Sequence, residues 1–203
     1  TRAIGYSLEA AVADIIDNSI AAGAKNVDIF FFPVDGAYVA ILDNGNGMGT
    51  EELNSAMQYG SKNPIDARDA KDLGRFGLGL KTASLSQCRC LTVVTKQGDR
   101  IEGRQWDVDH VTETGSWSLI VLEAEEFENI PNINELRAYE SGTLVVWQKL
   151  DRLIAGEINF DQALGRKIDG VREHLSLVFH RYLSGERGIT KMKISINGEK
   201  VPA

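Results

Sequence analysis

The sequence is poor in cysteine, histidine and proline, with two, three and four copies among 203 residues. Cys88 and Cys90 stand too close together to form a disulfide framework, which fits a reducing compartment. No second cysteine pair accompanies them, as a zinc site would need. The three histidines show no metal-ligand spacing either. We therefore expect buried, small apolar cysteines and histidines with structural or surface roles.

Positive charge is also scarce: 22 Lys and Arg stand against 29 Asp and Glu, giving a net charge of −7. A chain this acidic is a poor candidate for gripping nucleic-acid phosphates by itself. No apolar run approaches the roughly 18 residues of a membrane span, and no signal peptide opens the chain. We expect a cytoplasmic location, or a nuclear one in a eukaryote, and no membrane partner. The chain begins without Met and almost inside a helix, which suggests a longer protein.

Periodicity and turn residues predict mixed helices and strands. Expected helices run from the N-cap Ser7 to about Ala22, from Thr50 to Met57, from Gly79 to Gln87, and over Phe160–Leu183 as one helix or two. Expected strands cover Asn26–Phe32, Ala37–Leu42, Leu91–Lys96, Arg100–Trp106, Trp117–Glu123, Thr143–Gln148 and Lys191–Ile196. The three tryptophans fall in these strands and are expected in the core. Short connections between mixed elements indicate an α+β fold with a mixed or antiparallel sheet.

The first predicted helix carries Asp14, Asp17 and Asn18 on the face opposite its apolar residues. Asp14 and Asn18 are four residues apart, so their side chains point the same way. One interpretation is an ordinary solvated helix face. The other is an acid–amide pair that faces a ligand, with Asn18 giving a neutral oxygen to Mg²⁺ and Asp14 deprotonating a water. Short, weakly helix-forming side chains on this face favour the second interpretation.

Two glycine clusters follow. The segment from Asp43 to Met48, Asp-Asn-Gly-Asn-Gly-Met, comes after an apolar strand. It could be a plain hairpin turn. Its second glycine suggests instead a backbone that must approach something flat, beside an Asp carboxylate able to accept a hydrogen bond from an adenine amino group.

The second cluster runs from Gly74 to Ser84, and it lacks both the Gly-Lys step of a Walker A loop and the last glycine of a dinucleotide fingerprint. What remains is glycine-rich backbone that opens a helix, where free N–H groups favour phosphate. A glycine hinge without a ligand is the alternative. The polar stretch 58–73 before it has the length typical of a lid.

Taken in order, these segments resemble the Bergerat-fold (GHKL) ATPases, which include the gyrase B subunit, MutL, the ninety-kilodalton heat-shock chaperone and histidine kinases. Asp14 to Ser19 is similar to the first motif and Asp43 to Met48 to the second. Gly74 to Lys81 matches the third, and Gly142-Thr143 the fourth. The ending Gly-Leu-Lys-Thr-Ala-Ser looks most like the microrchidia (MORC) branch and its bacterial relatives. The resemblance implies a two-layer α/β sandwich, a mixed and mostly antiparallel sheet covered by helices on one face, as one domain over 1–203 with an ATP lid at 58–80.

The resemblance also implies roles for single residues. Asp43 would bind the adenine amino group, supported by Thr143, and Asn18 would ligate a Mg²⁺ that bridges the ATP phosphates. The remaining nucleotide-binding residues would be Gly45, Gly47 and Met48 of the second motif and Gly74, Gly77, Gly79, Leu80 and Lys81 of the third.

Asp14 stands where the family usually carries a glutamate general base. Asp is one methylene shorter, and a displacement of about 1 Å can cost about 10²-fold in rate. Two functions therefore stay open: a slow Mg-dependent ATPase, and a switch that binds ATP with little hydrolysis. A histidine kinase is disfavoured because no phosphoacceptor helix precedes the motifs.

Family analogy adds further expectations. Lid closure on ATP would drive homodimerisation, a clamp within a larger protein. Downstream transducer or effector domains would lie outside this chain. DNA manipulation or anti-phage defence would be its setting, with any DNA contact made by those other domains.

Overall fold

The computed structural model describes residues 6–33, 36–58, 78–116, 118–150, 153 and 160–203. Its helices are α1 (Leu8–Ala21), α2 (Thr50–Met57), α3 (Leu78–Gln87), α4 (Val108–Thr114), the 3-10 helix η1 (Ala124–Asn129), α5 (Ile133–Ala138), α7 (Phe160–Val178) and α8 (His180–Ser184). Its strands are β1 (Asn26–Phe32), β2 (Tyr38–Asp43), β3 (Cys90–Gln97), β4 (Arg100–Asp107), β5 (Ile120–Val121), β6 (Ser141–Gln148), β7 (Lys193–Ile196) and β8 (Glu199–Lys200).

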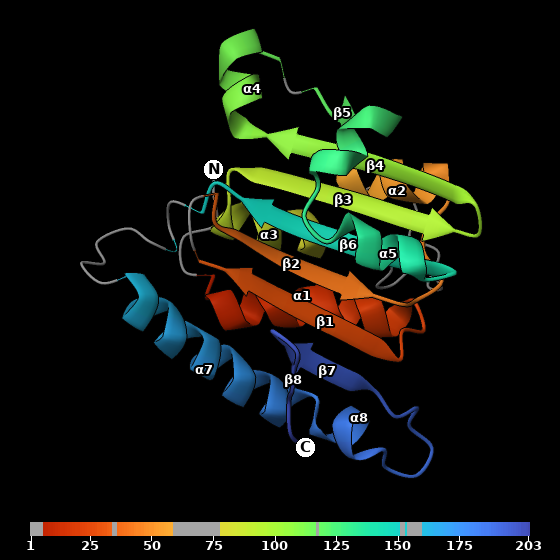
Figure 1. Ribbon diagram of the computed structural model, residues 1–203, viewed down its shortest axis with the longest axis vertical. Helices are drawn as coiled ribbons and strands as arrows, with labels where there is room; N and C mark the ends of the chain where they lie inside the picture. Colours follow the sequence, from red (N-terminus) through yellow and green to blue (C-terminus); the bar gives the residue numbers. More distant parts are fainter. Residues whose placement is uncertain (1–5, 34–35, 59–77, 117, 151–152, 154–159) are drawn as a thin grey trace, which may run out of the picture.

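The described strands form one sheet in the order β5-β4-β3-β6-β2-β1-β7-β8 (Figure 1). Neighbours are antiparallel except for β1 and β7, which run parallel. The three central strands β3, β6 and β2 pair so that Thr95 lies beside Thr143, and Thr143 beside Asp43. Three polar residues from distant parts of the sequence thus lie side by side on neighbouring central strands, near one end of these strands.

Helix α1 explains why one face of the sheet carries most of the core. Ser7 caps its first turn by accepting a hydrogen bond from the Ala10 N–H at 3.2 Å. Half of its residues are buried: Leu8, Ala11, Val12, Ala13, Ile15, Ile16 and Ser19. It packs with α3 and α7, and α1, α2 and α3 lie behind the sheet in the view of Figure 1. The larger apolar cluster fills the space between these helices and the strands.

A smaller apolar cluster lies on the opposite face of the sheet. Every second residue along a strand, such as Leu42 on β2 and Leu144 on β6, points to this face, because successive side chains of a strand point to opposite faces of the sheet. Leu136 of α5 and Phe127 of η1 cover them, and α5 lies in front of the sheet in Figure 1. The sequence analysis placed helices on one face alone and missed this second, smaller cover.

The α+β architecture with a mixed, mostly antiparallel sheet is confirmed. Phe160–Leu183 divides into α7 and α8 around Phe179, in line with the expected one helix or two. The expected strand Trp117–Glu123 is confirmed in part: among its described residues, Ile120 and Val121 pair, opposite Gln105 and Arg104. Its end is diverted because the Glu123 N–H donates to the Glu126 carboxylate at 2.7 Å, opening η1.

Trp106 and Trp147 are buried, and Trp117 lies outside the described residues. Both cysteines are buried, as expected, and burial raises the pKa of the Cys90 thiol to about 11. Among the described helices, none combines the length and the apolar character needed to cross a membrane.

Candidate nucleotide-binding site

A buried carboxylate is the centre of the candidate site. Asp43 ends β2 and is only 6% exposed. Its Oδ2 accepts a hydrogen bond from the Ser19 hydroxyl at 2.8 Å, and its Oδ1 accepts one from the Gly45 N–H at 2.9 Å. Burial raises its pKa, and hydrogen bonds from Gly45, Ser19 and the Thr143 backbone partly oppose that rise. A carboxylate has about four acceptor positions, so three donors leave room for about one more.

Ser19 is a site residue that the sequence analysis missed. It is buried, and α1 delivers it to Asp43 one position after Asn18 in the helix. The signal was its place inside the first motif, on the side of the helix that turns toward the sheet. Its hydroxyl also lies 3.3 Å from the Ile15 carbonyl, but the shorter contact goes to the carboxylate. Ser19 therefore ties α1 to the end of β2.

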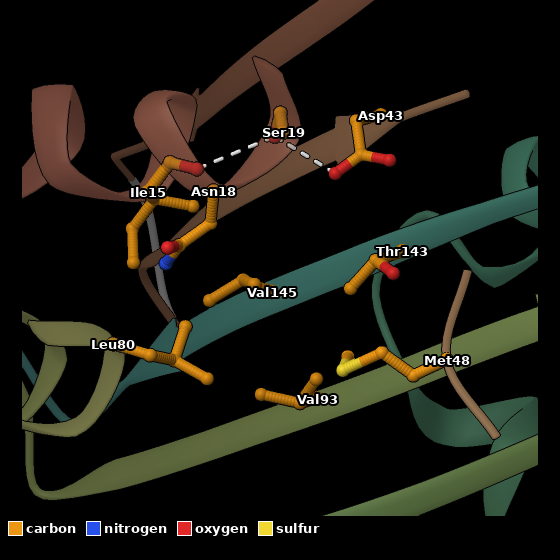
Figure 2. Close-up of a pocket in the computed structure, with 9 residues that line it drawn as sticks. All are labelled: Ile15, Asn18, Ser19, Asp43, Met48, Leu80, Val93, Thr143 and Val145. Carbon is orange, nitrogen blue, oxygen red and sulfur yellow. Dashed lines mark hydrogen bonds between the residues drawn. The ribbon is translucent and has the colours of Figure 1, made fainter. Parts of the chain in front are cut away.

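An apolar pocket opens beside this carboxylate. Its lining residues come from α1, β2, β3, β6, α3 and the glycine loop: Ile15, Asn18, Ser19, Asp43, Met48, Leu80, Val93, Thr143 and Val145. In the view of Figure 2, Asn18 and Leu80 lie toward the left, whereas Asp43, Thr143 and Met48 lie toward the right. The pocket thus has an acidic end and an amide end, joined by aliphatic side chains.

Thr95 is a second residue that the sequence analysis missed. Its hydroxyl accepts a hydrogen bond from the Met48 N–H at 2.7 Å and lies 3.3 Å from the Thr143 hydroxyl. It therefore holds Met48 against the same row that contains Thr143 and Asp43. No motif marks Thr95, because its role comes only from strand register.

The glycines of the second motif approach the chain's own backbone. A Cβ on Gly47 would lie 2.3 Å from the Lys96 carbonyl oxygen, and the residue has φ +67°. A Cβ on Gly45 would lie 2.9 Å from both the Cβ and the carbonyl oxygen of Ala22. The Asn46 N–H donates to that same carbonyl at 2.8 Å. The sequence analysis expected a close approach here, and the surfaces that the structure shows against these two glycines are the end of α1 and the edge of β3.

The third motif is described only in part. Gly74 and Gly77 lie outside the described residues. Leu80 lines the pocket, Gly79 is exposed, and Lys81 is buried. Burial lowers the pKa of the Lys81 ammonium group. Of the expected phosphate-binding residues that the structure describes, Leu80 therefore reaches the pocket and Gly79 and Lys81 do not line it.

Asp14 lies one helical turn before Asn18 and does not line the pocket. Its carboxylate is half-buried, and its Oδ2 accepts a hydrogen bond from the Tyr6 hydroxyl. Burial raises the pKa of Asp14. Asp17 is more exposed than Asp14. Its carboxylate still loses part of its hydration, and this loss, together with the nearby charge of Asp14, raises the pKa of Asp17. Asn18, by contrast, is half-buried and faces the pocket, so the polar face of α1 is divided between solvent and site.

The donor set fits a nucleotide with Mg²⁺ better than a protein-held metal. Among the described residues, no three His, Cys, Asp or Glu side chains gather as a metal site would require. Mg²⁺ commonly keeps several waters and takes one or two protein oxygens together with substrate phosphates. The Asn18 amide oxygen is a ligand of that kind. At the other end, aliphatic walls and one buried acceptor suit a flat ring with an amino edge.

A family model described as histidine kinase-, DNA gyrase B-, and HSP90-like ATPase matches residues 6–143. Because the match covers more than half of the chain, the protein belongs to this ATPase family. All four motifs of the sequence analysis begin within the matched range.

Two curated relatives share about a third of the aligned residues. ATPase morc-1 of Caenorhabditis elegans is 32% identical over 88 residues, which is 43% of this chain and 10% of that protein. The DNA mismatch repair protein MutL of Shewanella sediminis is 30% identical over 96 residues, 46% of this chain and 15% of that protein. The chain therefore spans only a small part of the length of these relatives.

A solved structure of the N-terminal domain of a DNA repair protein has the same fold, with a TM-score of 0.54 at 18% identity. The likeness covers 96% of this chain and 52% of that one. At this identity the comparison shows the fold alone.

The raised pKa of Asp43 predicts how the stability of the ligand-free domain depends on pH. The folded state holds the proton more tightly than the unfolded state, whose pKa is near the ordinary value of 3.8. The protonated Asp43 side chain therefore contributes its full stabilisation below the unfolded-state pKa, and this stabilisation is lost as the pH rises through the pKa of the folded state. Asp43→Asn removes this titration. Urea unfolding at several pH values should show the wild type losing free energy of unfolding relative to Asp43→Asn as the pH rises. If the free energies of unfolding of the two proteins changed in parallel with pH, the prediction that Asp43 is a buried, titrating carboxylate would be contradicted.

Proposed function

We propose that this domain binds ATP with Mg²⁺ in the pocket beside Asp43 and hydrolyses it slowly. The observation that carries the proposal is the buried Asp43 carboxylate at one end of an apolar pocket whose other end holds the Asn18 amide. Membership of the ATPase family supports the same function.

The two ends of the pocket support one orientation for the nucleotide. Adenine would lie between aliphatic residues such as Met48, Val93 and Val145, with its amino group donating to Asp43. Thr143, in the same row of the sheet, would support that contact. The phosphates would then extend toward Asn18 and the start of α3, where Leu80 lines the pocket. When bound, Mg²⁺ would neutralise phosphate charge and be held by the Asn18 amide oxygen.

Asp14 is the proposed general base. Its carboxylate lies on the same helix as Asn18, one turn away, and burial raises its pKa toward the range in which a carboxylate accepts a proton more readily. It would take a proton from water as the water oxygen bonds to the γ-phosphorus. The bond from that phosphorus to the ADP oxygen would break, and ADP would leave with the bonding electrons.

Nucleotide binding is tested by calorimetry of MgATP and MgADP with wild type, Asp43→Asn and the surface control Asp169→Asn. The Asp43→Asn change would put an amide NH₂ group where a carboxylate oxygen now accepts from Ser19 or Gly45. We expect at least a tenfold loss of affinity for Asp43→Asn, about the strength of a hydrogen bond to a charged group. Asp169 is exposed on α7, and its variant should bind like wild type. Equal affinities for all three proteins would contradict the proposed site.

A second candidate function is a switch that binds ATP and barely hydrolyses it. The short side chain of Asp14 is the observation that favours it, because a carboxylate set back by about 1 Å can lose about 10²-fold in rate. Both candidates share the binding site and differ only in the competence of Asp14.

Phosphate release by Asp14→Asn, Asp14→Glu and the control Asp17→Asn separates the two functions. For the ATPase we expect Asp14→Asn to lose about 10²-fold or more in kcat, with nucleotide affinity kept. The kcat of Asp14→Glu should then rise by less than about tenfold, because a base that is already well placed leaves no loss of about 10²-fold to recover. Asp17→Asn removes an exposed carboxylate from the same helix and should stay near wild type. A gain of about 100-fold for Asp14→Glu would instead favour the switch.

The nucleotide would also control assembly. The expected lid, 58–80, lies almost wholly outside the described residues, so this step rests on the family resemblance. Lid closure over MgATP would drive homodimerisation as a clamp within a larger protein. A relative that matches this chain is named as a DNA mismatch repair protein, and DNA manipulation or anti-phage defence is the setting we propose. The net charge of −7 supports the proposal that any DNA contact is made by other domains.

Sedimentation velocity with a non-hydrolysable ATP analogue and Mg²⁺ tests this clamp. We expect a dimer with the analogue and a monomer without nucleotide. The Asp43→Asn variant is the matched control and should stay monomeric under both conditions. A wild-type domain, or a longer form of the protein, that binds the analogue and remains monomeric would refute the clamp while leaving the ATP site intact.

A further inference from the structure

Tyr6 makes a contact that neither the motifs nor the family match explains. It precedes α1, and its hydroxyl donates a hydrogen bond to Oδ2 of Asp14, eight residues later. The Tyr6 ring is half-buried and packs against the large apolar cluster. The contact therefore joins the segment before α1 to the carboxylate that the proposed function uses as a base.

Gln87 fixes Tyr6 from a second side. Its Nε2 donates to the Tyr6 carbonyl oxygen at 3.0 Å and also to the Ser86 hydroxyl at 2.9 Å. Gln87 is 6% exposed and is the last residue of α3, the helix that begins with the third motif and carries Leu80. Helix α3 packs on α1. The Gln87 side chain of α3 therefore holds the backbone of Tyr6, and the hydroxyl of Tyr6 holds the Asp14 carboxylate of α1.

We propose that Tyr6 is a positioning residue for Asp14, which fixes the orientation of the carboxylate and leaves its Oδ1 to accept the proton from water. The proposal rests on the proposed hydrolysis for its catalytic meaning. The hydrogen bond itself exists in the protein without nucleotide, so it can be tested separately.

The geometry gives this contact a physical purpose. An aspartate carboxylate can rotate about two side-chain torsions, so a donor on one oxygen selects one orientation. With Oδ2 occupied by the phenol, Oδ1 is the oxygen that can face water. Tyr6 keeps its own proton throughout, because the proton from water goes to Oδ1. A shorter acid that is held in place loses less of its rate than one free to rotate, since catalysis depends on near-attack geometry.

The first experiment compares Tyr6→Phe with Tyr38→Phe in kcat and in nucleotide affinity. Both changes remove one phenolic oxygen from a half-buried ring. Tyr38 begins β2, at the end of the strand away from Asp43, and its ring stacks on Phe32. We expect Tyr6→Phe to lower kcat about tenfold, a fraction of the roughly 10²- to 10⁴-fold that a general base contributes, with an unchanged Kd for MgATP. Tyr38→Phe should alter neither. An unchanged kcat for Tyr6→Phe overturns the proposal.

A double-mutant cycle asks whether Tyr6 acts through Asp14. Introduced into Asp14→Asn, Tyr6→Phe should have no further effect on kcat, because the group that it orients is gone. An equal loss in both backgrounds would assign Tyr6 a general structural role and would overturn the proposal.

A third measurement needs no nucleotide or Mg²⁺. Carboxyl-carbon NMR would follow the titration of Asp14, assigned with Asp14→Asn, with Asp17 recorded as the neighbouring acid. A donor to the charged form lowers a pKa, so Tyr6→Phe should raise the pKa of Asp14. An unchanged pKa would refute the contact whether or not the protein hydrolyses ATP. If wild type released no phosphate, hydrolysis would be refuted, and this measurement alone would decide whether Tyr6 holds Asp14.

Discussion

The cost of burying the Asp43 carboxylate constrains the rest of the site. Removing a charge from water costs several kcal/mol unless donors replace the lost hydration. Those donors come from three separate segments: Ser19 on α1, the Gly45 N–H in the loop after β2, and the Thr143 backbone on β6. Helix, loop and strand must therefore meet at one end of the sheet for this carboxylate to be tolerated. A buried acid with spare acceptor capacity beside an apolar pocket is then available to a ligand.

Close backbone contacts make that meeting point possible. Gly47 lies against the Lys96 carbonyl, and a Cβ on Gly142 would lie 2.1 Å from the carbonyl oxygen of Asp43. Any side chain at Gly142 would push β6 from β2 and open the row that joins Asp43 to Thr143. The glycines of the second and fourth motifs thus serve the packing of the chain itself. The space left between the packed segments, lined by aliphatic side chains, is the pocket.

Much of the fold could be predicted from periodicity. The strands β1, β3, β4 and β6 and the helices α1, α2 and α3 lie close to their expected positions, because apolar runs, helical periodicity or turn and cap residues mark them in the sequence. The missed elements are short. Helices α4 and α5 have seven and six residues, too few to show a clear helical period. Helix α5 forms, with η1, where the second face of the sheet needs cover. The strand expected at Trp117–Glu123 shortened because a local capping contact at Glu123 competes with pairing.

The sequence by itself indicated the family, because four motifs in order resemble it, and it supplied candidates for the main site residues. It could not reveal Ser19, Thr95 or Tyr6, whose roles come from helix rotation, strand register and a contact across the start of α1. The tertiary structure decided that Asp43 is buried and that Asn18 faces the pocket while Asp14 turns to a tyrosine. The physical reason is that spacing fixes which residues can share a face, whereas packing between distant segments fixes what that face meets.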